Sequence, residues 1–222
     1  MNSSNRRNSV CAIVPFYNEE KFLFDVVTKT LEYVDQVIAV NDGSTDDSEN
    51  LIKNLHGVVI LSIENNMGKG SALQAGFNEG LKHNCDLILT LDGDGQHNPD
   101  MIPSFISLSE KYDIIIGNRL NNISKMPLMR VLSNKITSKL LSIKMKQKII
   151  DSQCGFRLYW RQVLENVKTS SIGYEAESEI LIHASRLGYK IGFVEIPTIY
   201  ENEKSKMKSL EAILGFLKVL LK

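Results

Sequence analysis

The sequence predicts an α/β protein whose core is a mostly parallel, twisted sheet with helices on both faces. Through the first half of the chain, short β-rich runs alternate with longer amphipathic segments, a pattern typical of parallel strands joined by crossover helices. Polar motifs follow several of these runs, and ligands bind at the carboxyl ends of the strands in such sheets. A chain of 222 residues has the size of one such domain.

The first half of the chain supplies most of the expected sheet. Its strands are expected at Val10–Pro15, Gln36–Val40, Val58–Ser62, Leu87–Leu91 and Asp113–Gly117. Helical patterns fill the intervals at Glu19–Tyr33, Asp47–Leu55, Lys69–Lys82 and Pro99–Lys111. Asn98 followed by Pro99 predicts a helix start, because a capping side chain precedes a proline in the first turn.

The alternation loosens after Arg119. The expected elements there are a loop at Asn121–Lys125, a helix at Leu128–Ile143, a turn and strand within Ile149–Tyr159, a helix at Tyr174–Leu187 and a strand at Ile191–Ile196. Gly188 is expected to end the helix before it. The sequence contains no repeat and no low-complexity linker, which favours one domain.

Charge and cysteine content narrow the function classes. The chain has 26 basic and 26 acidic side chains, so it lacks the surplus of positive charge that a general nucleic-acid binder needs. Its three cysteines are widely spaced and form no CxxC pair, so they are interpreted as reduced thiols of a cytoplasmic protein. No signal-peptide core follows the polar N-terminus, and no apolar run reaches the ~18–20 residues that span a bilayer.

The strongest chemical motif is Asp92-Gly-Asp94-Gly-Gln96, which follows an apolar strand. Two carboxylates on a glycine-rich turn suit Mg²⁺ or Mn²⁺, which bind through one or two carboxylates together with substrate phosphates. An ordinary Asp-Gly turn is the alternative. A calcium-binding EF-hand loop is a poor alternative, because Pro103 stands where that loop needs its final glutamate.

Two further motifs follow strands. In Asn41-Asp42-Gly-Ser-Thr, Ser44 or Thr45 is expected to cap the next helix, while Asp42 precedes the cap and could accept hydrogen bonds from a nucleotide base. In Pro15-Phe-Tyr-Asn-Glu19, Glu19 could hold a ribose hydroxyl, and Asn18 could cap a helix equally well.

Together the motifs resemble glycosyltransferase family 2 with the GT-A fold. The resemblance rests on Pro15-Phe-Tyr-Asn-Glu, Asn41-Asp-Gly-Ser-Thr-Asp, Asn66-Met-Gly-Lys-Gly, Asp92-Gly-Asp-Gly-Gln-His and Gly117-Asn-Arg. Three further segments, Asp151-Ser-Gln-Cys-Gly-Phe-Arg157, Glu195-Ile-Pro-Thr-Ile-Tyr and Ser205-Lys-Met, are similar to the dolichyl- or polyprenyl-phosphate mannose or glucose synthase branch. The resemblance implies a catalytic domain at residues 10–208, after a flexible segment at 1–9 and before an amphipathic helix at 209–222.

The resemblance also implies roles for individual residues. The positions that match the donor-nucleotide site are Pro15, Tyr17, Glu19, Asp42, Lys69 and Asp92. The positions that match the metal and diphosphate site are Asp92, Asp94 and Gln96. The positions assigned to donor or acceptor phosphate are Arg119, Arg130, Ser133, Arg157 and Lys206.

Several of these residues have alternative readings. Arg130 and Lys206 could be surface charges, and Arg157 could be a structural partner of Asp151. Lys69 lies in a glycine-rich turn that lacks the P-loop pattern, so a P-loop is rejected. His97 is interpreted as a support for Gln96 rather than a metal ligand.

The expected reaction is inverting transfer of mannose or glucose, from GDP-mannose or UDP-glucose, to a polyprenyl phosphate. A phosphate oxygen is already ionised at neutral pH and needs no catalytic base. A hydroxyl acceptor would need a base, for which Asp151 is the candidate; the other catalytic assignments are Asp94, Gln96, Arg119 and Arg130. A binding-only homologue is a third reading, which the intact Asp92–Gln96 motif disfavours.

The lipid acceptor requires membrane contact, and the sequence offers Leu210–Lys222 for it. This apolar-rich helix, flanked by lysines, could lie in the bilayer interface or pack against the core or a partner. The expected location is the cytoplasmic face of a membrane. The oligomeric state and the choice between Mg²⁺ and Mn²⁺ are left open.

Overall fold

Seven strands of the described residues form one sheet in the order β3-β2-β1-β4-β6-β5-β7. The computed structural model describes residues 7–123, 126–169, 171, 173, 175–199 and 215–220. The strands are β1 (Val10–Phe16), β2 (Gln36–Asp42), β3 (Val58–Ile63), β4 (Leu87–Thr90), β5 (Ile114–Asn118), β6 (Arg157–Trp160) and β7 (Ile191–Glu195).

All neighbouring strands run parallel except β6, which is antiparallel to both β4 and β5. Because β6 reverses direction between two strands that point the same way, the carboxyl ends of β1, β2, β4, β5 and β7 all lie at one edge of the sheet. Strands β1, β4 and β5 are buried along their whole length, as expected for strands covered on both faces.

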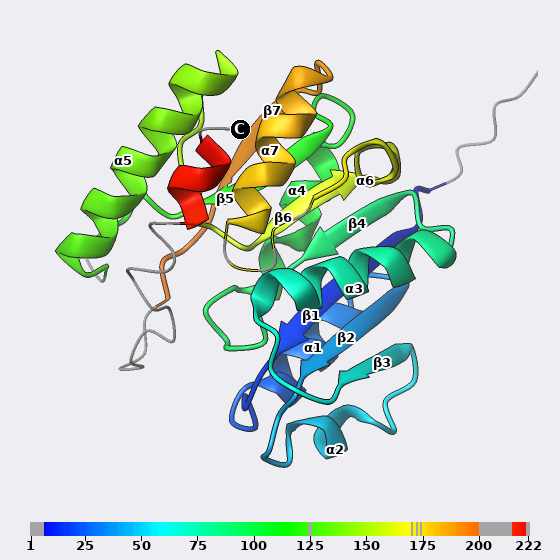
Figure 1. The fold of residues 1–222 in the computed structure, drawn as a ribbon. Coiled ribbons are helices and arrows are strands. Elements are labelled where there is room, and N and C mark those ends of the chain that lie inside the picture. Colours follow the sequence, from blue (N-terminus) through cyan, green and yellow to red (C-terminus); the bar gives the residue numbers. More distant parts are fainter. Residues whose placement is uncertain are drawn as a thin grey trace, which may run out of the picture.

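Helices cover the sheet (Figure 1). They are α1 (Leu23–Leu31), α2 (Ser48–Ile52), α3 (Lys69–Lys82), α4 (Ile102–Leu108), α5 (Leu128–Met145), α6 (Arg161–Asn166) and α7 (Ala176–Arg186), with a 3₁₀ turn η1 (Pro99–Met101) before α4. Helix α3 crosses β1 and β2, where the missing side chain of Gly76 admits Ile13 and Val40. Helix α5 stands to one side of the sheet and packs against α7 (Figure 1).

The expected elements are confirmed, with shifted ends. Asn98 caps η1 as predicted, since its side chain accepts a hydrogen bond from the Asp100 amide, and Gly188 follows α7 with a positive φ of 83°. The expectation that Ser44 or Thr45 caps α2 is wrong, because that helix begins at Ser48. Asn18 does not cap α1 either, since α1 begins at Leu23. The short helix α6 was not predicted from the sequence.

Two further expectations are resolved by packing. Cys11 on β1 and Cys85 before β4 form a disulfide, with their Cα atoms 5.8 Å apart, so the expectation of three reduced thiols is wrong; Cys154 is a free, buried thiol. Residues 215–220 are helical, and Val219 is buried in the core, so this part of the C-terminal segment packs on the protein. Within the described residues, no helix is both long and apolar enough to cross a membrane.

Candidate active site

The strand-end motifs meet at one edge of the sheet, as predicted. Tyr17 and Glu19 follow β1, Asp42 ends β2, Asp92 follows β4 and Arg119 follows β5. Because these strands share one direction, their carboxyl ends form a single polar border along one edge of the sheet.

Asp92 and Asp94 lie on the turn after β4. The backbone amide of Gln96 donates a hydrogen bond to Asp94 Oδ1 over 3.0 Å, which fixes the Asp94 carboxylate at the turn. Burial, together with the negative charge of Asp92, raises the pKa of Asp94 to about 7. The two carboxylates therefore concentrate more negative charge than the surroundings of Asp94 stabilise.

This excess negative charge is the observation against which a divalent cation can be tested. A cation between Asp92 and Asp94 would relieve it, and oxygen ligands are those that Mg²⁺ and Mn²⁺ prefer. No group of three or more His, Cys, Asp or Glu side chains in the described residues is arranged to hold a metal ion by itself. The carboxylate oxygens of Asp92 and Asp94 thus fit a divalent cation in chemistry and in charge.

Lys69 at the start of α3 holds the Asp92 carboxylate. Its Nζ lies 2.7 Å from Asp92 Oδ1 and 3.8 Å from Glu177 Oε2. Burial alone would lower the pKa of Lys69, but the negative charges of Asp92 and Glu177 outweigh it, so the pKa is raised. The ammonium stays charged and keeps Asp92 ionised: the pKa of Asp92 is lowered despite its burial.

Gly155 makes the contact between Lys69 and Asp92 possible. A Cβ at Gly155 would lie 2.5 Å from Lys69 Nζ and 3.0 Å from Asp92 Oδ2. Any side chain at this position would therefore push apart the ion pair at the centre of the site.

His97 holds the turn that carries Asp92 and Asp94. Its Nδ1 accepts a hydrogen bond from the Asp92 amide over 3.1 Å, and its ring lies 5.3 Å from that of Phe156. Burial lowers the pKa of His97 to about 4, so the ring is neutral near pH 7. An uncharged ring that accepts from a backbone amide orients the turn; that His97 is not a metal ligand stays a prediction.

Asp151 is the partner of Arg119. Arg119 Nε donates to Asp151 Oδ2 over 2.9 Å and its Nη2 donates to Oδ1 over 3.0 Å, while Asn134 Nδ2 donates to Oδ1 over 2.6 Å. Asp151 is fully buried. Burial would raise its pKa, but Arg119 and Asn134 more than offset this and lower it. A low-pKa carboxylate whose oxygens already accept several hydrogen bonds takes up a proton less readily, so these contacts favour a positioning role for Asp151. Its assignment as a catalytic base stays a prediction.

Arg157 is paired with Glu177, whereas Asp151 is paired with Arg119, so the expectation that Arg157 is the structural partner of Asp151 is wrong. Its assignment to a phosphate stays a prediction. Arg157 is fully buried, and its guanidinium donates to the carbonyls of Cys154, Ser152 and Glu177. Its carboxylate neighbour is Glu177, 3.7 Å away. Arg157 therefore fixes the chain before β6 to the start of α7.

Asp42 shapes the loop that carries Lys69. Its two oxygens accept hydrogen bonds from the amides of Met67 and Gly68 over 2.8 and 2.9 Å. A nucleotide base would have to share these oxygens with the loop. Asp42 therefore connects the end of β2 to the start of α3.

Other predicted nucleotide-site residues lie close by. The amide of Glu19 donates to Ser48 Oγ, and the Asn18 side chain accepts from the Thr45 amide. The Pro15 carbonyl accepts from the Gly93 amide, which joins β1 to the Asp92 turn. Tyr17 is half-buried at the same edge.

The remaining phosphate-site predictions divide between α5 and residues outside the described part. Arg130 is half-buried in the first turn of α5, and Ser133 Oγ accepts from the Gln153 side chain over 3.2 Å. Lys206 lies outside the described residues.

Sequence reasoning missed Glu177, Gly155 and Asn134. Glu177 lies in the first turn of α7, and its Oε1 is buried without a hydrogen-bond partner. Its sequence context, Tyr-Glu-Ala-Glu-Ser-Glu, is typical of a solvated helix start and gave no indication of burial. Gly155 could have been noted as a glycine inside a matched motif, whereas Asn134 lies in an ordinary helical pattern.

Comparison with known proteins connects this geometry to a family. The family model described as Glycosyl transferase family 2 matches residues 11–168. The chain is 30% identical to a UDP-N-acetylglucosamine–dolichyl-phosphate N-acetylglucosaminyltransferase of Methanococcus voltae, over 92% of this chain and 90% of that protein. It is 32% identical to a dolichyl-phosphate beta-glucosyltransferase of Trichomonas vaginalis, over 93% of this chain and 69% of that protein.

Solved structures share the fold. Glucosyl-3-phosphoglycerate synthase from Mycobacterium tuberculosis, in complex with Mn²⁺, UDP-glucose and phosphoglyceric acid, superposes with a TM-score of 0.75. That alignment covers 96% of this chain and 80% of the synthase at 18% identity. The GT-A fold expected from the sequence is thereby confirmed.

Proposed function

We propose that this chain, which belongs to glycosyl transferase family 2, moves a hexose from a nucleoside-diphosphate sugar to a polyprenyl phosphate with inversion at the anomeric carbon. The observation that carries the proposal is the carboxylate pair Asp92 and Asp94 at the end of β4, beside the Arg119–Asp151 pair at the end of β5. Relatives named for transfer to dolichyl phosphate support the acceptor class.

The donor side is assigned to the carboxylate turn. Asp92 and Asp94, with Gln96, would hold Mg²⁺ or Mn²⁺ together with the donor diphosphate. When bound, the cation supplies stabilisation of the negative charge that develops on the departing diphosphate. Lys69, whose Nζ contacts Asp92, would also stabilise the negative charge of the diphosphate.

The hydrogen bonds to Asp151 indicate which class of acceptor the site suits. Because its oxygens are filled by Arg119, Asn134 and backbone amides, the site offers no ready base at this position. A phosphate acceptor needs none, since its oxygen is already ionised at neutral pH. Arg119 and Arg130 would align that phosphate for in-line attack.

A hydroxyl acceptor is the second candidate function. It is favoured by one observation: Glu177 Oε1 is a buried carboxylate oxygen without a hydrogen-bond partner. It lies 3.7 Å from Arg157 Nε, and Glu177 Oε2 lies 3.8 Å from Lys69 Nζ. A carboxylate oxygen that accepts no hydrogen bond is the kind of group that could accept a proton from a saccharide hydroxyl.

The donor sugar is proposed only as a hexose. One relative is named for UDP-N-acetylglucosamine and another for glucose, so N-acetylglucosamine joins mannose and glucose among the donors to test. The donor nucleotide is GDP or UDP.

A transfer assay tests the proposal. Purified protein is given radiolabelled GDP-mannose, UDP-glucose or UDP-N-acetylglucosamine, with Mg²⁺ or Mn²⁺. The acceptor is a short, water-soluble polyprenyl phosphate, the matching polyprenol, or a free saccharide. The expected result is label on the polyprenyl phosphate from one donor, lost when the cation is chelated. The control for substitutions of the carboxylates after β4 is Asp25→Asn, which removes an exposed carboxylate of α1.

Two outcomes would contradict the proposal. Label on the saccharide or polyprenol but not on the phosphate would transfer the assignment to the hydroxyl reaction, and Glu177→Gln would then be tested as loss of its base. Donor binding without transfer to any acceptor would favour a binding protein.

A further inference from the structure

Helix α5 presents an apolar stripe to solvent. Its outer face holds five large apolar side chains that are 50–82% exposed: Leu128, Met129, Leu132, Ile136 and Ile143. They recur at helical spacing on one side of α5, while Val131, Asn134, Ser138, Leu141 and Met145 face the protein. The other large exposed apolar residues, such as Phe24, Leu51 and Leu187, are scattered singly over other elements, which is ordinary for a protein surface.

The same region is cationic in a chain of zero net charge. Residues 114–150 contain eight lysines and arginines and no aspartate or glutamate. On a helical projection, Lys135 and Lys139 border one side of the apolar stripe, and Arg130 and Lys144 border the other. An apolar stripe with a basic border on each side is the pattern of a helix that lies in a membrane interface.

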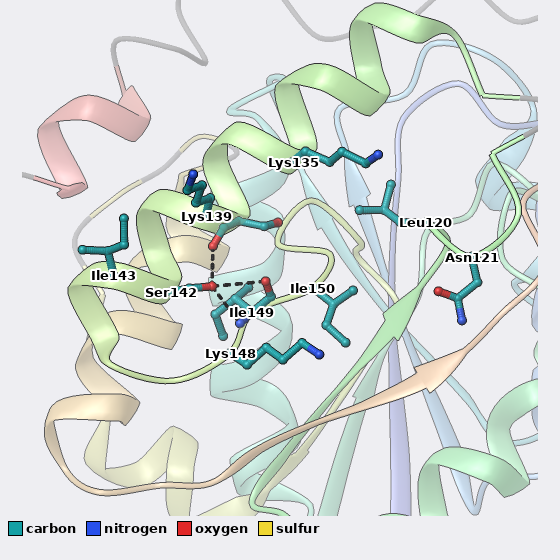
Figure 2. A pocket seen from close by; sticks show the side chains of 10 residues that line it. Leu120, Asn121, Lys135, Lys139, Ser142, Ile143, Lys148, Ile149 and Ile150 are labelled. Atoms are coloured by element: carbon teal, nitrogen blue, oxygen red, sulfur yellow. Dashed lines mark hydrogen bonds between the residues drawn. The ribbon is translucent and has the colours of Figure 1, made fainter.

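A basic recess adjoins the stripe (Figure 2). This pocket has a volume of about 580 Å³, between α5, the chain that follows it and the loop after β5. Lys135 extends from α5 toward Leu120, and Lys148 borders the same space from below (Figure 2). Within the described part of the chain, neither lysine forms an ion pair.

The pocket combines positive charge with apolar walls. Lys135, Lys139 and Lys148 line it together with Leu120, Ile149 and Ile150. A lipid headgroup joins a phosphate to an apolar chain, which matches this combination. A second copy of this chain fits poorly, because a symmetric contact would set the lysines of one copy against those of the other.

The position of α5 links this surface to the site. Its inner face supplies Asn134, which holds Asp151 and through it Arg119. Its first turn carries Arg130, between the two most exposed apolar side chains of the helix and the protein interior. One helix therefore has a face toward the site and a face toward solvent.

We propose that the outer face of α5, with the lysine-lined pocket beside it, docks the protein on an anionic phospholipid bilayer. The proposal rests on the proposed function and extends it, since a membrane-bound acceptor would then reach Arg130 from the bilayer side. It places the membrane contact on α5 rather than on residues 215–220, the described part of the C-terminal segment, whose Val219 is buried in the core.

Vesicle flotation tests the docking surface without donor or transfer. The full chain is mixed with vesicles of phosphatidylcholine alone, or with phosphatidylglycerol as about one lipid in three. We expect binding to the anionic vesicles that weakens in high salt. L132Q/I136Q should lower the partition coefficient by more than about 10-fold, and K135Q/K139Q by roughly 10- to 30-fold.

Matched controls separate the α5 face from surface hydrophobicity and net charge. L51Q/L187Q removes two exposed apolar side chains elsewhere, and K53Q/K111Q removes two exposed lysines. Both control variants should bind vesicles as the unchanged protein does. Equal binding of the α5 variants and their controls, or no binding to anionic vesicles at all, would overturn the proposal. A dimer in analytical ultracentrifugation that L132Q/I136Q disrupts, without vesicle binding, would assign the stripe to a second copy instead.

Transfer to the water-soluble polyprenyl phosphate, without vesicles, separates this proposal from the proposed function. The L132Q/I136Q variant should keep the rate of the unchanged protein there, because neither side chain faces the site. Soluble transfer without vesicle binding would refute docking by α5 and leave the function standing. Vesicle binding without any transfer would refute the function and leave the docking surface standing.

Discussion

The region of β1 to β4 and the region of β5, β6 and α5 contribute to one site but are built differently. In the first, parallel strands deliver carboxylates to their ends, and local backbone contacts hold them, such as the Gln96 amide on Asp94. In the second, a buried ion pair between Arg119 and Asp151 is held by α5, a helix whose opposite face is apolar and exposed.

The two regions therefore have different roles. The first region gathers negative charge that a cation can neutralise, and the Gln96 backbone amide, two residues away, holds the Asp94 carboxylate. The second region positions arginines through contacts between residues distant in sequence, such as Arg119 with Asp151. We therefore expect substitutions in the first region to change chemistry, and substitutions in the second to change stability as well.

The largest expected effect is on the second region. Asp151→Asn removes the charge that pairs with Arg119 while keeping nearly the same size. Breaking a buried ion pair by removing one partner costs about 3–5 kcal/mol, which lowers Tm by roughly 10 °C for a chain of this length. Thermal unfolding followed by circular dichroism measures it.

The matched control is Glu165→Gln, which removes the exposed ion-pair partner of Arg161 within α6. Such exposed pairs contribute about 0–1 kcal/mol, so its Tm should change little. Equal losses in the two variants would show that the Arg119–Asp151 pair is not the support of this region.

The next effect belongs to the carboxylate turn. Asp94→Asn should lower transfer by about 100- to 1,000-fold, the range seen when one electrostatic contact to a developing charge is lost. Its Tm should be maintained or rise, because the variant removes a buried negative charge next to Asp92. Activity and thermal unfolding are measured on the same preparation, and an active variant would contradict the role of Asp94.

A smaller effect tests the packing beneath the first region. Gly76→Ala would put a Cβ 2.4 Å from Ile13 Cγ2, whereas Gly80→Ala on the same helix meets Ile88 at an ordinary 3.4 Å. Overpacking costs about 1–3 kcal/mol, while alanine gains up to about 1 kcal/mol over glycine in a helix. Denaturant unfolding should therefore show a loss for Gly76→Ala and no loss for Gly80→Ala. Equal behaviour would indicate that α3 is not closely fitted to β1.

The most gradual expected effect is a pH dependence without metal, because it is spread over about three pH units. The folded chain raises the pKa of Asp94 from its usual value near 4 to about 7. The folded state therefore binds more protons between these values, and its stability falls as pH rises from about 4 to 7. One full proton corresponds to a slope of about 1.4 kcal/mol per pH unit. The slope should disappear in Asp94→Asn and shrink when Mn²⁺ is present; an identical slope in the variant would contradict the assignment.

The sequence predicted the first region well because its information is local. Apolar runs set the strands, and motifs such as Asp92-Gly-Asp94 come directly after them, so one rule about strand ends places them together. The Asn98 cap depends on neighbours only two residues apart, and it was confirmed.

The second region could be predicted less well, because its contacts join distant residues. Choosing Arg119 rather than Arg157 as the partner of Asp151 requires the position of β6 between β4 and β5, which no local pattern states. Glu177 lies 108 positions from Lys69 in the chain, so their proximity follows only from the packing of α7 beside the site. The exposure of the α5 stripe likewise depends on which elements cover that helix.

Binding of Mn²⁺ followed by electron paramagnetic resonance tests the central claim most directly. The free Mn²⁺ signal is recorded for the unchanged protein and for Asp94→Asn, with and without GDP or UDP. Cooperative loss of the free signal when protein and one nucleoside diphosphate are both present, and its absence in the variant, is the predicted result. Equal Mn²⁺ uptake by the two proteins, or uptake that no nucleotide strengthens, would contradict a shared metal and diphosphate site at the end of β4.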